Sequence, residues 1–407
     1  MIRTRPYIII IYLTAVALLT ACHHDDDLKP YERVMPKVER TVIFYMAGQN
    51  NLNYALQVNI DSLVAAREAI PENCNVIVFR DSPDESTISQ LTTKKGLTTW
   101  YQYPKNVNSC DSTAMLEVLR RIVRHFPARH YGLVYGSHAT GWTPRNLVRR
   151  KTVGLDWGQI IANGKLYMSM NLSELRWTLE YLPHFDYIFF DACFMQDIEI
   201  AYELRRETDW IIASPAEIPA PGAPYDKRML TALCTADAEG IVNSYHDGFP
   251  NRRNWPYGGV PISAIRCDSL EVLARATRQY VPTLFANRNE VSTYGFQPHC
   301  DYARNVERTP MYIDYTYHFD MKTTMYRLLS TDEFATWEAA YEAAVPYHPS
   351  VTSWHANACI HTTISDPAHY GAVAMFVPLG VYDQTGLNDS IHQTEWYKAA
   401  GWDETGW

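Results

Sequence analysis

Short apolar runs alternate with amphipathic segments through the first half of the chain, and this alternation constrains the fold more than any other feature. Apolar, β-rich runs predict buried strands at 41–46, 75–79, 131–135, 187–190 and 210–213. Helical patterns predict helices at about 52–69, 112–125, 171–182 and 197–206, and residues 88–103 predict a hairpin around Lys95-Gly96. Strands that alternate with helices predict an α/β sandwich: a mostly parallel central sheet with helices on both faces.

The second half of the chain is less regular. Helical patterns cover 226–248, 270–288 and 332–345, and strand-like runs cover 260–266, 312–317 and 371–377. Loops are expected at 139–168, at the proline-rich 215–224 and at 289–310. Because no clean linker divides the chain, we predict one domain over 39–390 that includes a C-terminal elaboration.

The first residues have the pattern of an export signal. Arg3 and Arg5 precede an apolar run at 7–19 that is too short for a comfortable membrane span, and Leu-Thr-Ala-Cys22 follows it. This pattern predicts a lipoprotein signal peptide over 1–21, lipidation at Cys22 and an acidic tether over 22–38. The expected location is the outer membrane or cell surface of a Gram-negative bacterium. The alternative is an ordinary signal peptide with an incidental cysteine.

Charge and cysteine usage exclude several classes of protein. The net charge is −9 and no basic stripe occurs, so nucleic acid is not an expected partner. The eight cysteines are widely and irregularly spaced without a C-x-x-C pair, which predicts neither a disulfide framework nor a zinc site. Seven remain without Cys22, and this odd number is typical of a chain with one free reactive thiol. No H-E-x-x-H motif indicates a catalytic metal.

Polar and nucleophilic residues follow the predicted strands directly. Asn50, His138, Cys193 and Ser214 each lie just beyond a strand, and ligands bind at the carboxyl ends of parallel strands. A thiolate and a histidine that meet in space can carry nucleophilic catalysis. A helix predicted after Cys193 would lower the pKa of its thiol. Each residue alone also fits a structural role, Cys193 as a small buried hydrophobe and His138 as a solvated strand end.

Five motifs together resemble the clostripain family, peptidase family C11, whose members are clan CD cysteine peptidases with a caspase-like α/β/α sandwich. They are Tyr-Met-Ala to Asn-Asn-Leu at 45–52, His-x-x-Gly-Trp at 138–142, Asp-Ala-Cys-Phe-Met at 191–195, the helix at 198–204 and Ala-Ser-Pro-Ala-Glu at 213–217. The 55 positions from His138 to Cys193 are similar to the roughly 50 typical of caspases.

The resemblance implies roles for individual residues. Cys193 would be the nucleophile, His138 the general acid and base, and the N–H groups of Cys193 and Ala139 the oxyanion hole. Asp191 would form the floor of an S1 pocket for Arg or Lys, with Asn50 and Ser214 at its rim. A structural alternative for Asp191 is to cap the following helix.

The resemblance also implies partners and processing. The expected substrates are peptides or proteins with Arg or Lys at the cleavage site, and the expected membrane contact is the lipid anchor. We expect no required cofactor, although the family pattern allows a calcium requirement. Self-cleavage is predicted near Arg149, Arg150 and Lys151, in a basic loop that otherwise has the composition of a solvated segment.

The chain departs from the family pattern at two positions. Ala139 stands where glycine usually follows the histidine, and Gln49 replaces an acidic residue before Asn-Asn. If residue 139 needed a positive φ, alanine would cost about 1 kcal/mol or more. Two functions therefore stay open: an Arg/Lys-directed cysteine endopeptidase, or a catalytically impaired surface lipoprotein that keeps the fold to bind a peptide or partner.

Overall fold

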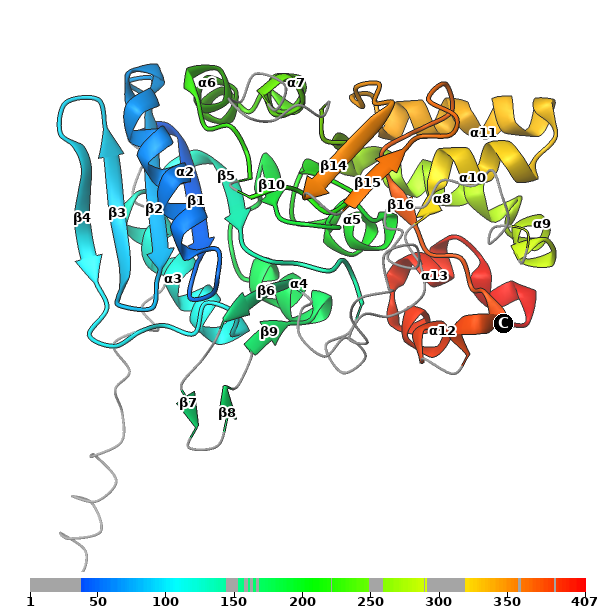
Figure 1. Cartoon of the computed structure of the whole chain (residues 1–407), viewed down its shortest axis with the longest axis horizontal. Helices are drawn as coiled ribbons and strands as arrows, with labels where there is room; N and C mark the ends of the chain where they lie inside the picture. The colour runs from blue at the N-terminus through cyan, green and yellow to red at the C-terminus, as the bar shows by residue number, and fades with distance from the viewer. Residues whose placement is uncertain are drawn as a thin grey trace, which may run out of the picture. The chain divides into compact units, whose positions relative to one another are not determined.

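An eight-stranded sheet lies at the centre of the molecule, and its strand order is β12-β11-β10-β5-β1-β2-β3-β4 (Figure 1). The computed structural model describes residues 38–143, 153–156, 160–161, 164–165, 168–220, 222–248, 259–288, 290, 319–357, 360–383 and 386–407. The strands are β1 (Val38–Ala47), β2 (Cys74–Asp81), β3 (Ser86–Thr92), β4 (Gly96–Gln102), β5 (Ala128–Gly136), β10 (Tyr187–Asp191), β11 (Trp210–Ala213) and β12 (Ser263–Arg266).

Five neighbouring strands of this sheet are parallel. They are β11, β10, β5, β1 and β2, whereas β12 at one edge and the hairpin β3–β4 at the other are antiparallel. The fold predicted from the alternation, an α/β sandwich with a mostly parallel central sheet, is therefore confirmed, as is the hairpin around Lys95-Gly96.

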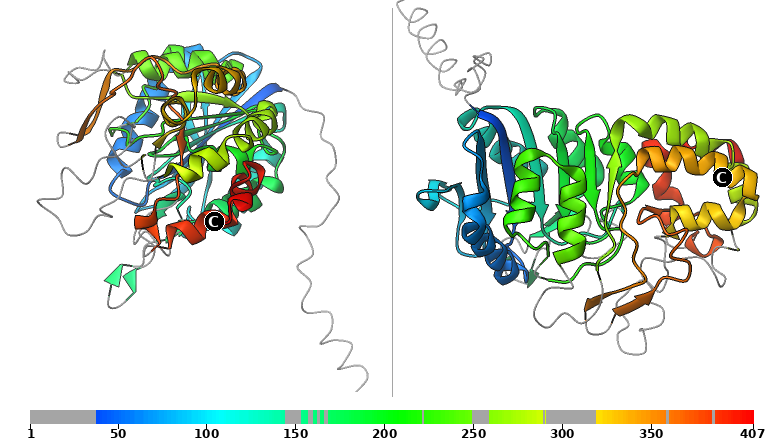
Figure 2. Two further views of the ribbon diagram at one scale, coloured as in Figure 1. Left: turned by 90° about the vertical axis from the view of Figure 1, so that its right-hand side faces the viewer. Right: turned by 90° about the horizontal axis from the view of Figure 1, so that it is seen from above.

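Helices cover both faces of the sheet. One apolar cluster joins α2 (Asn53–Ala66), α6 (Lys227–Thr235) and α7 (Ala238–Gly248) to one face. Figure 2 shows α6 and α7, in green, along the same side of the sheet as the blue α2. A second cluster joins α3 (Ser112–His125), α4 (Leu172–Glu180) and α5 (Ile198–Leu204) to the other face.

Successive side chains of the central strands serve the two clusters in turn. In β1, Phe44 and Met46 belong to the α2–α6–α7 cluster, whereas Ile43 and Tyr45 belong to the α3–α4–α5 cluster. Side chains of a strand alternate between its faces, so a strand covered on both faces is apolar at nearly every position. This requirement explains the continuous apolar runs in the sequence.

Capping residues set the starts of two predicted helices. Asp111 Oδ1 accepts a hydrogen bond from Ala114 N at 2.9 Å and starts α3 at Ser112, as the pattern predicts. Asn171 and Glu174 form a capping box at the start of α4, in which Asn171 N donates to Glu174 Oε2 at 2.7 Å.

The C-terminal third packs beside the α3–α4–α5 cluster. Its helices are α8 (Leu270–Arg278), α9 (Val281–Ala286), α10 (Met321–Leu328), α11 (Thr331–Ala344), α12 (Leu387–Ser390) and α13 (Glu395–Ala399). The buried tryptophans Trp337, Trp396 and Trp402 belong to the same apolar cluster as α5, so the final residues are part of this core. Figure 1 shows α10 and α11 at the opposite end of the molecule from β4.

One prediction for the less regular segments is wrong, and several elements were missed. The expected loop at 139–168 contains β6 (Val153–Asp156), which pairs with β9 (Met168–Met170), and a two-residue pair of β7 (Ile160–Ile161) and β8 (Gly164–Lys165). The predicted run at 371–377 contains a shorter strand, β16 (Ala374–Met375), which pairs with β13 (Phe319–Asp320). The helix α10 and the hairpin of β14 (Ser353–Asn357) and β15 (Ile360–Thr363) were not expected. Strands of two residues, such as β7, β8, β13 and β16, carry too little periodicity to be recognised.

Other predicted segments lie outside the described residues, namely the N-terminal signal and tether, the strand at 312–317 and nearly all of the loop at 289–310. Among the helices that the structure describes, none combines the length and the apolar character that crossing a membrane requires.

Candidate active site

The site lies where the strand order of the sheet reverses. After β1 the chain adds β2, β3 and β4 on one side, and after α3 it returns to place β5 on the other side of β1. In open parallel sheets, ligands bind beyond the carboxyl ends of the strands at such a switch point. The segments that leave β1 and β5 here contain Asn50, Asn51 and His138.

Strand register aligns His138 with Cys193. Strands β5 and β10 are neighbours, and Gly136 is the register partner of Asp191. His138 and Cys193 each follow their strand by two residues, so they leave the sheet at the same level on strands about 5 Å apart. Both side chains are partly exposed. The topology therefore brings the two predicted catalytic residues to one edge of the sheet.

Cys193 differs from the other described cysteines in its exposure. The cysteines that the structure describes as thiols are Cys74, Cys110, Cys193, Cys234 and Cys267, of which Cys193 alone is not buried. Burial raises the pKa of the Cys267 thiol, which disfavours a thiolate there. Exposure is a requirement for a nucleophile, so among the described thiols Cys193 fits this role best.

The thiol of Cys193 faces the backbone of Ile218. Ile218 N donates a hydrogen bond to Sγ at 3.4 Å, and the Ile218 carbonyl oxygen lies 4.0 Å from the same sulfur. Both the donor and the acceptor of the Ile218 peptide group thus contact the sulfur. The thiol therefore contacts the segment that follows β11.

The helix after Cys193 begins where the sequence predicts but ends two residues earlier, at Leu204. It starts at Ile198 with Asp197 as the N-cap, five residues beyond the cysteine. The predicted start of this helix is confirmed, and because Asp197 is its N-cap, Asp191 does not cap it. The residues between form a turn in which Phe194 is buried and has a φ of 58°. Such a conformation is rare for a bulky residue, and strain of this kind clusters at functional sites.

Ser214 supports this turn instead of lining an open pocket. Its side chain is buried, and its Oγ accepts a hydrogen bond from Ala216 N at 3.1 Å. The backbone of the same segment accepts from the turn, since Gln196 N donates to Ser214 O and Phe194 N to Ala216 O. Ser214 therefore holds the end of β11 against the turn that carries Cys193.

Asp191 is buried beneath the segment that leads into α6. Its two carboxylate oxygens accept hydrogen bonds from Ala223 N at 2.9 and 3.0 Å, and Oδ2 accepts a third from Tyr225 Oη at 2.8 Å. Gly222 lies against the carboxylate, and a Cβ added to it would meet both oxygens at 2.6 Å. The predicted floor of an S1 pocket is thus a carboxylate two residues before Cys193, covered by 222–225.

Asn50 is buried and stabilises the turn after β1. Its Nδ2 donates to Ala47 O at 2.9 Å, and its Oδ1 accepts from Leu52 N at 2.8 Å. These two bonds give the amide of Asn50 a structural role next to the predicted site.

Asn51, which sequence reasoning did not single out, contacts His138 instead. Asn51 Oδ1 lies 2.7 Å from His138 Nε2, within hydrogen-bond distance. The Asn-Asn pair was part of the motif at 45–52, but a sequence pattern does not tell which amide faces a residue 87 positions away. In the folded chain Asn50 is buried and Asn51 is exposed, and this difference in burial distinguishes their roles.

Ala139 adopts a conformation that suits any residue. The described non-glycine residues with positive φ are Phe194, Ala236 and Ala372, and Ala139 is not among them. Its side chain is buried in the α3–α4–α5 cluster. Alanine therefore carries no left-handed strain at this position. The backbone conformation gives no reason to prefer glycine for the N–H that is predicted to donate to the oxyanion.

The remaining predicted sites lie outside the described residues. These are Cys22, Arg149, Arg150 and Lys151. Within the part of the chain that the structure describes, no group of three or more His, Cys, Asp or Glu side chains is arranged to hold a metal ion.

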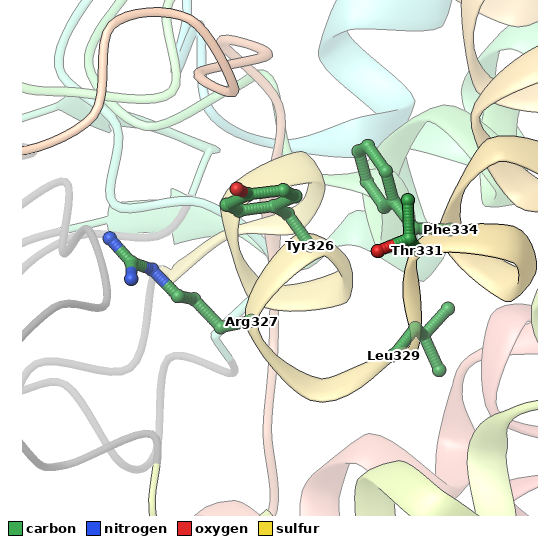
Figure 3. Close-up of a pocket in the computed structure, with 5 residues that line it drawn as sticks. All are labelled: Tyr326, Arg327, Leu329, Thr331 and Phe334. Carbon is green, nitrogen blue, oxygen red and sulfur yellow. The ribbon is translucent and has the colours of Figure 1, made fainter.

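A pocket in the C-terminal third is separate from this chemistry. It has a volume of about 250 Å³ and is lined by Tyr326, Arg327, Leu329, Thr331 and Phe334 (Figure 3). These residues belong to α10, α11 and the link between them and supply no thiol, carboxylate or imidazole. The strand ends, and not this pocket, carry the residues for nucleophilic chemistry.

An α/β sandwich with a partly exposed thiol and an imidazole at neighbouring strand ends has the fold of a caspase-like cysteine peptidase. The chain belongs to the clostripain family, peptidase family C11, whose family model matches residues 44–407. The predicted family membership is thereby confirmed.

Individual relatives agree with this assignment. The chain is 24% identical over 241 residues to the clostripain of Hathewaya histolytica, a match that covers 50% of this chain and 45% of that protein. It thus spans less than half the length of this curated relative. Among solved structures, a secreted C11 cysteine protease from Bacteroides thetaiotaomicron, in complex with an irreversible peptide inhibitor, is 26% identical with a TM-score of 0.75. That match covers 90% of this chain and 99% of the other.

A further structure shares the fold. It is an inactive zymogen C11 protease from Parabacteroides distasonis, 24% identical with a TM-score of 0.71, and the match covers 90% of this chain and 99% of that one.

Proposed function

We propose that the protein is a cysteine endopeptidase that cleaves after Arg or Lys, with Cys193 as the nucleophile and His138 as the general acid and base. The observation that carries the proposal is the register of β5 and β10, in which Gly136 pairs with Asp191 and both catalytic residues follow two positions later. Membership of the clostripain family supports the same reaction class.

The chemistry requires only these two side chains and a water molecule. His138 accepts the proton of the Cys193 thiol, and the thiolate attacks the scissile carbonyl carbon. The tetrahedral intermediate collapses as His138 gives the proton to the leaving amine, which leaves a thioester on Cys193. Water then loses a proton to His138 and attacks the thioester, which releases the acid and restores the thiol. Backbone N–H groups of Cys193 and Ala139 would stabilise the oxyanion.

Asp191 would recognise the basic side chain of the substrate. A buried carboxylate suits a bidentate guanidinium, and Asp191 lies two residues from the nucleophile. Its oxygens are already bonded to Ala223 and Tyr225 and covered by Gly222, so substrate entry requires 222–225 to move. Asp191→Asn should lower kcat/KM for Arg substrates about 10- to 100-fold. Activity toward an uncharged residue at the same subsite serves as the internal control.

An activity-based probe tests the main proposal. A biotinylated peptide with Arg next to an acyloxymethyl ketone should label the wild type and neither Cys193→Ala nor His138→Ala. Far-UV circular dichroism should show that all three proteins are folded. Absence of labelling in the folded wild type, or labelling that persists in Cys193→Ala, would reject Cys193 as the nucleophile.

One observation favours a second function, binding without hydrolysis. Ile218 contacts the Cys193 sulfur, and Ala223 contacts the Asp191 carboxylate. If these two contacts do not open, the protein would be a catalytically impaired lipoprotein that uses the fold to bind a peptide or partner. In that case the probe labels no variant, whereas a peptide still binds the wild type in calorimetry with an affinity that Asp191→Asn leaves unchanged.

Self-cleavage and export complete the proposal. We propose cleavage near Arg149, Arg150 and Lys151, in the segment between the two catalytic residues. Purified wild type should then run as two chains and Cys193→Ala as one; a wild type that cuts Arg substrates yet stays intact contradicts self-cleavage. We also propose export as a lipoprotein anchored through Cys22. The Cys22→Ser variant should leave the membrane fraction if the anchor is correct.

A further inference from the structure

We propose that Asn51 is a positioning residue that fixes the orientation and the tautomer of the His138 imidazole. The inference rests on the proposed function of His138 and goes beyond it. Asn51 Oδ1 lies 2.7 Å from Nε2 of His138, and an amide oxygen only accepts hydrogen bonds. Nε2 must therefore carry the proton, which leaves Nδ1 of the neutral ring as the basic nitrogen.

This tautomer matters for the reaction. A general base needs its lone pair on the nitrogen that faces the thiol, and the other ring nitrogen is set by the hydrogen bond it makes. An acceptor at Nε2 also stabilises the imidazolium that forms when Nδ1 takes the thiol proton, because both ring nitrogens are then donors. Asn51 would thus favour the state that is productive for proton transfer from Cys193.

The turn that carries Asn51 is tied to the strand that carries His138. Ala47 O accepts one hydrogen bond from Asn50 Nδ2 at 2.9 Å and another from Ser137 Oγ at 3.0 Å. Residues directly before Asn51 and directly before His138 are therefore fixed to the same carbonyl group. The buried amide of Asn50 holds the turn, and this leaves the amide of Asn51 in place against the imidazole.

The backbone of the turn reinforces this arrangement. Gly48 N donates to Asp81 O at 2.9 Å, which joins the turn to the end of β2, and Asn50 N donates to Gly48 O at 2.7 Å. Asn53 N donates to Asn50 O at 3.2 Å, at the start of α2. These hydrogen bonds fix the backbone of the turn, so little conformational entropy is lost when Asn51 contacts His138. The 2.7 Å contact between the two side chains is therefore preorganised.

The test compares a substitution that removes the acceptor with one that keeps it. Asn51→Leu has nearly the same shape without an amide, and Asn51→Asp keeps an oxygen at the same place. Asn53→Leu is the matched control, because its amide faces Arg80 and not His138. We expect Asn51→Leu to lower kcat about 10- to 100-fold with KM within about twofold, since it removes orientation of a general base. Asn51→Asp should recover most of this loss, and Asn53→Leu should resemble the wild type.

If Asn51 had a purely structural role, Asn51→Leu would lower the melting temperature without lowering kcat selectively at a nearly constant KM. A wild-type kcat in Asn51→Leu would overturn the inference. If the wild type itself shows no Cys193-dependent turnover, the proposed function fails, and the inference is then judged by ¹⁵N NMR of the His138 ring in the Cys193→Ala protein. There we expect the Nε2–H tautomer while Asn51 is kept, and a mixture of tautomers once Asn51→Leu is added; an unchanged spectrum would refute the inference.

Discussion

Gly136 and Asp191 are register partners on the neighbouring parallel strands β5 and β10. Because each strand continues by two residues to His138 and Cys193, a thiol and an imidazole leave the sheet side by side at its switch point. The turn after Cys193, with Phe194 at a φ of 58°, then directs the chain away from the strand. The site is thus a consequence of how two strands align.

The first prediction concerns Ala139, which departs from the family pattern. Because Ala139 does not need a positive φ, Ala139→Gly should leave kcat/KM within about threefold of the wild type. The variant should be about 1 kcal/mol less stable in urea unfolding, since it loses a buried methyl group and gains backbone freedom when unfolded. A turnover more than about tenfold higher would show that alanine does constrain the oxyanion hole.

The second prediction concerns Gly222, which packs on the buried carboxylate of Asp191. Gly222 has a φ of 77°, and a Cβ there would lie 2.6 Å from both carboxylate oxygens. Gly222→Ala should therefore displace either the loop or the carboxylate and break the hydrogen bonds from Ala223.

Gly96→Ala is the matched control for this substitution. Gly96 has a φ of 67° but nothing within 4 Å of an added Cβ, so it reports the backbone strain alone. The loss of unfolding free energy in Gly222→Ala should exceed that in Gly96→Ala by about 1–3 kcal/mol, the cost of leaving a buried polar group without its partners. Equal losses would mean that the contact with Asp191 contributes nothing.

The third prediction concerns pH and Glu199, a buried carboxyl on α5. Burial, and secondarily the negative charge of Asp197, raise the pKa of Glu199 from 4.5 to about 8. The folded state therefore keeps a proton that the unfolded state releases at lower pH. The free energy of unfolding should fall as pH rises from about 4.5 to 8 and change no further from this group above that range.

Glu199→Gln removes the titrating group but keeps its shape. It should flatten the decline between pH 4.5 and about 8 and make the protein more stable than the wild type at the upper end of that range. Glu117→Gln, at a carboxylate whose side chain is 62% exposed, should leave the decline in place. The measurement is chemical unfolding at several pH values, and a decline that persists in Glu199→Gln would contradict the assignment.

The fourth prediction concerns metal ions. The thiol of Cys193 and the imidazole of His138 supply both the nucleophile and the proton carrier, so the reaction as proposed has no step that needs a cofactor. Peptide hydrolysis should be unchanged after dialysis against EDTA. Loss of activity that calcium restores would instead establish a calcium requirement of the kind that the family pattern allows.

The elements that the sequence predicted correctly are those specified by local features, namely a continuous apolar run or a capping side chain. The runs at 41–46 and 187–190 are apolar because helices cover both faces of β1 and β10, and Asp111 and Asn171 start helices through their own side chains. The two-residue pair β13–β16 was missed because it depends on a partner far along the chain, and the hairpin β14–β15 was also missed. Their stability comes from those partners and not from local propensity.

The sequence by itself determined the class of fold, the family, and which histidine and cysteine stand at strand ends. These follow from local periodicity and from short motifs, both of which are properties of neighbouring residues. Only the tertiary structure decided that Asn51 and not Asn50 contacts His138, that Ile218 and not a helix faces the thiol, and that Gly222 covers Asp191. Each of these contacts joins residues at least 25 positions apart in the chain. Such residues meet only through the strand order and register of the sheet, which local sequence does not specify.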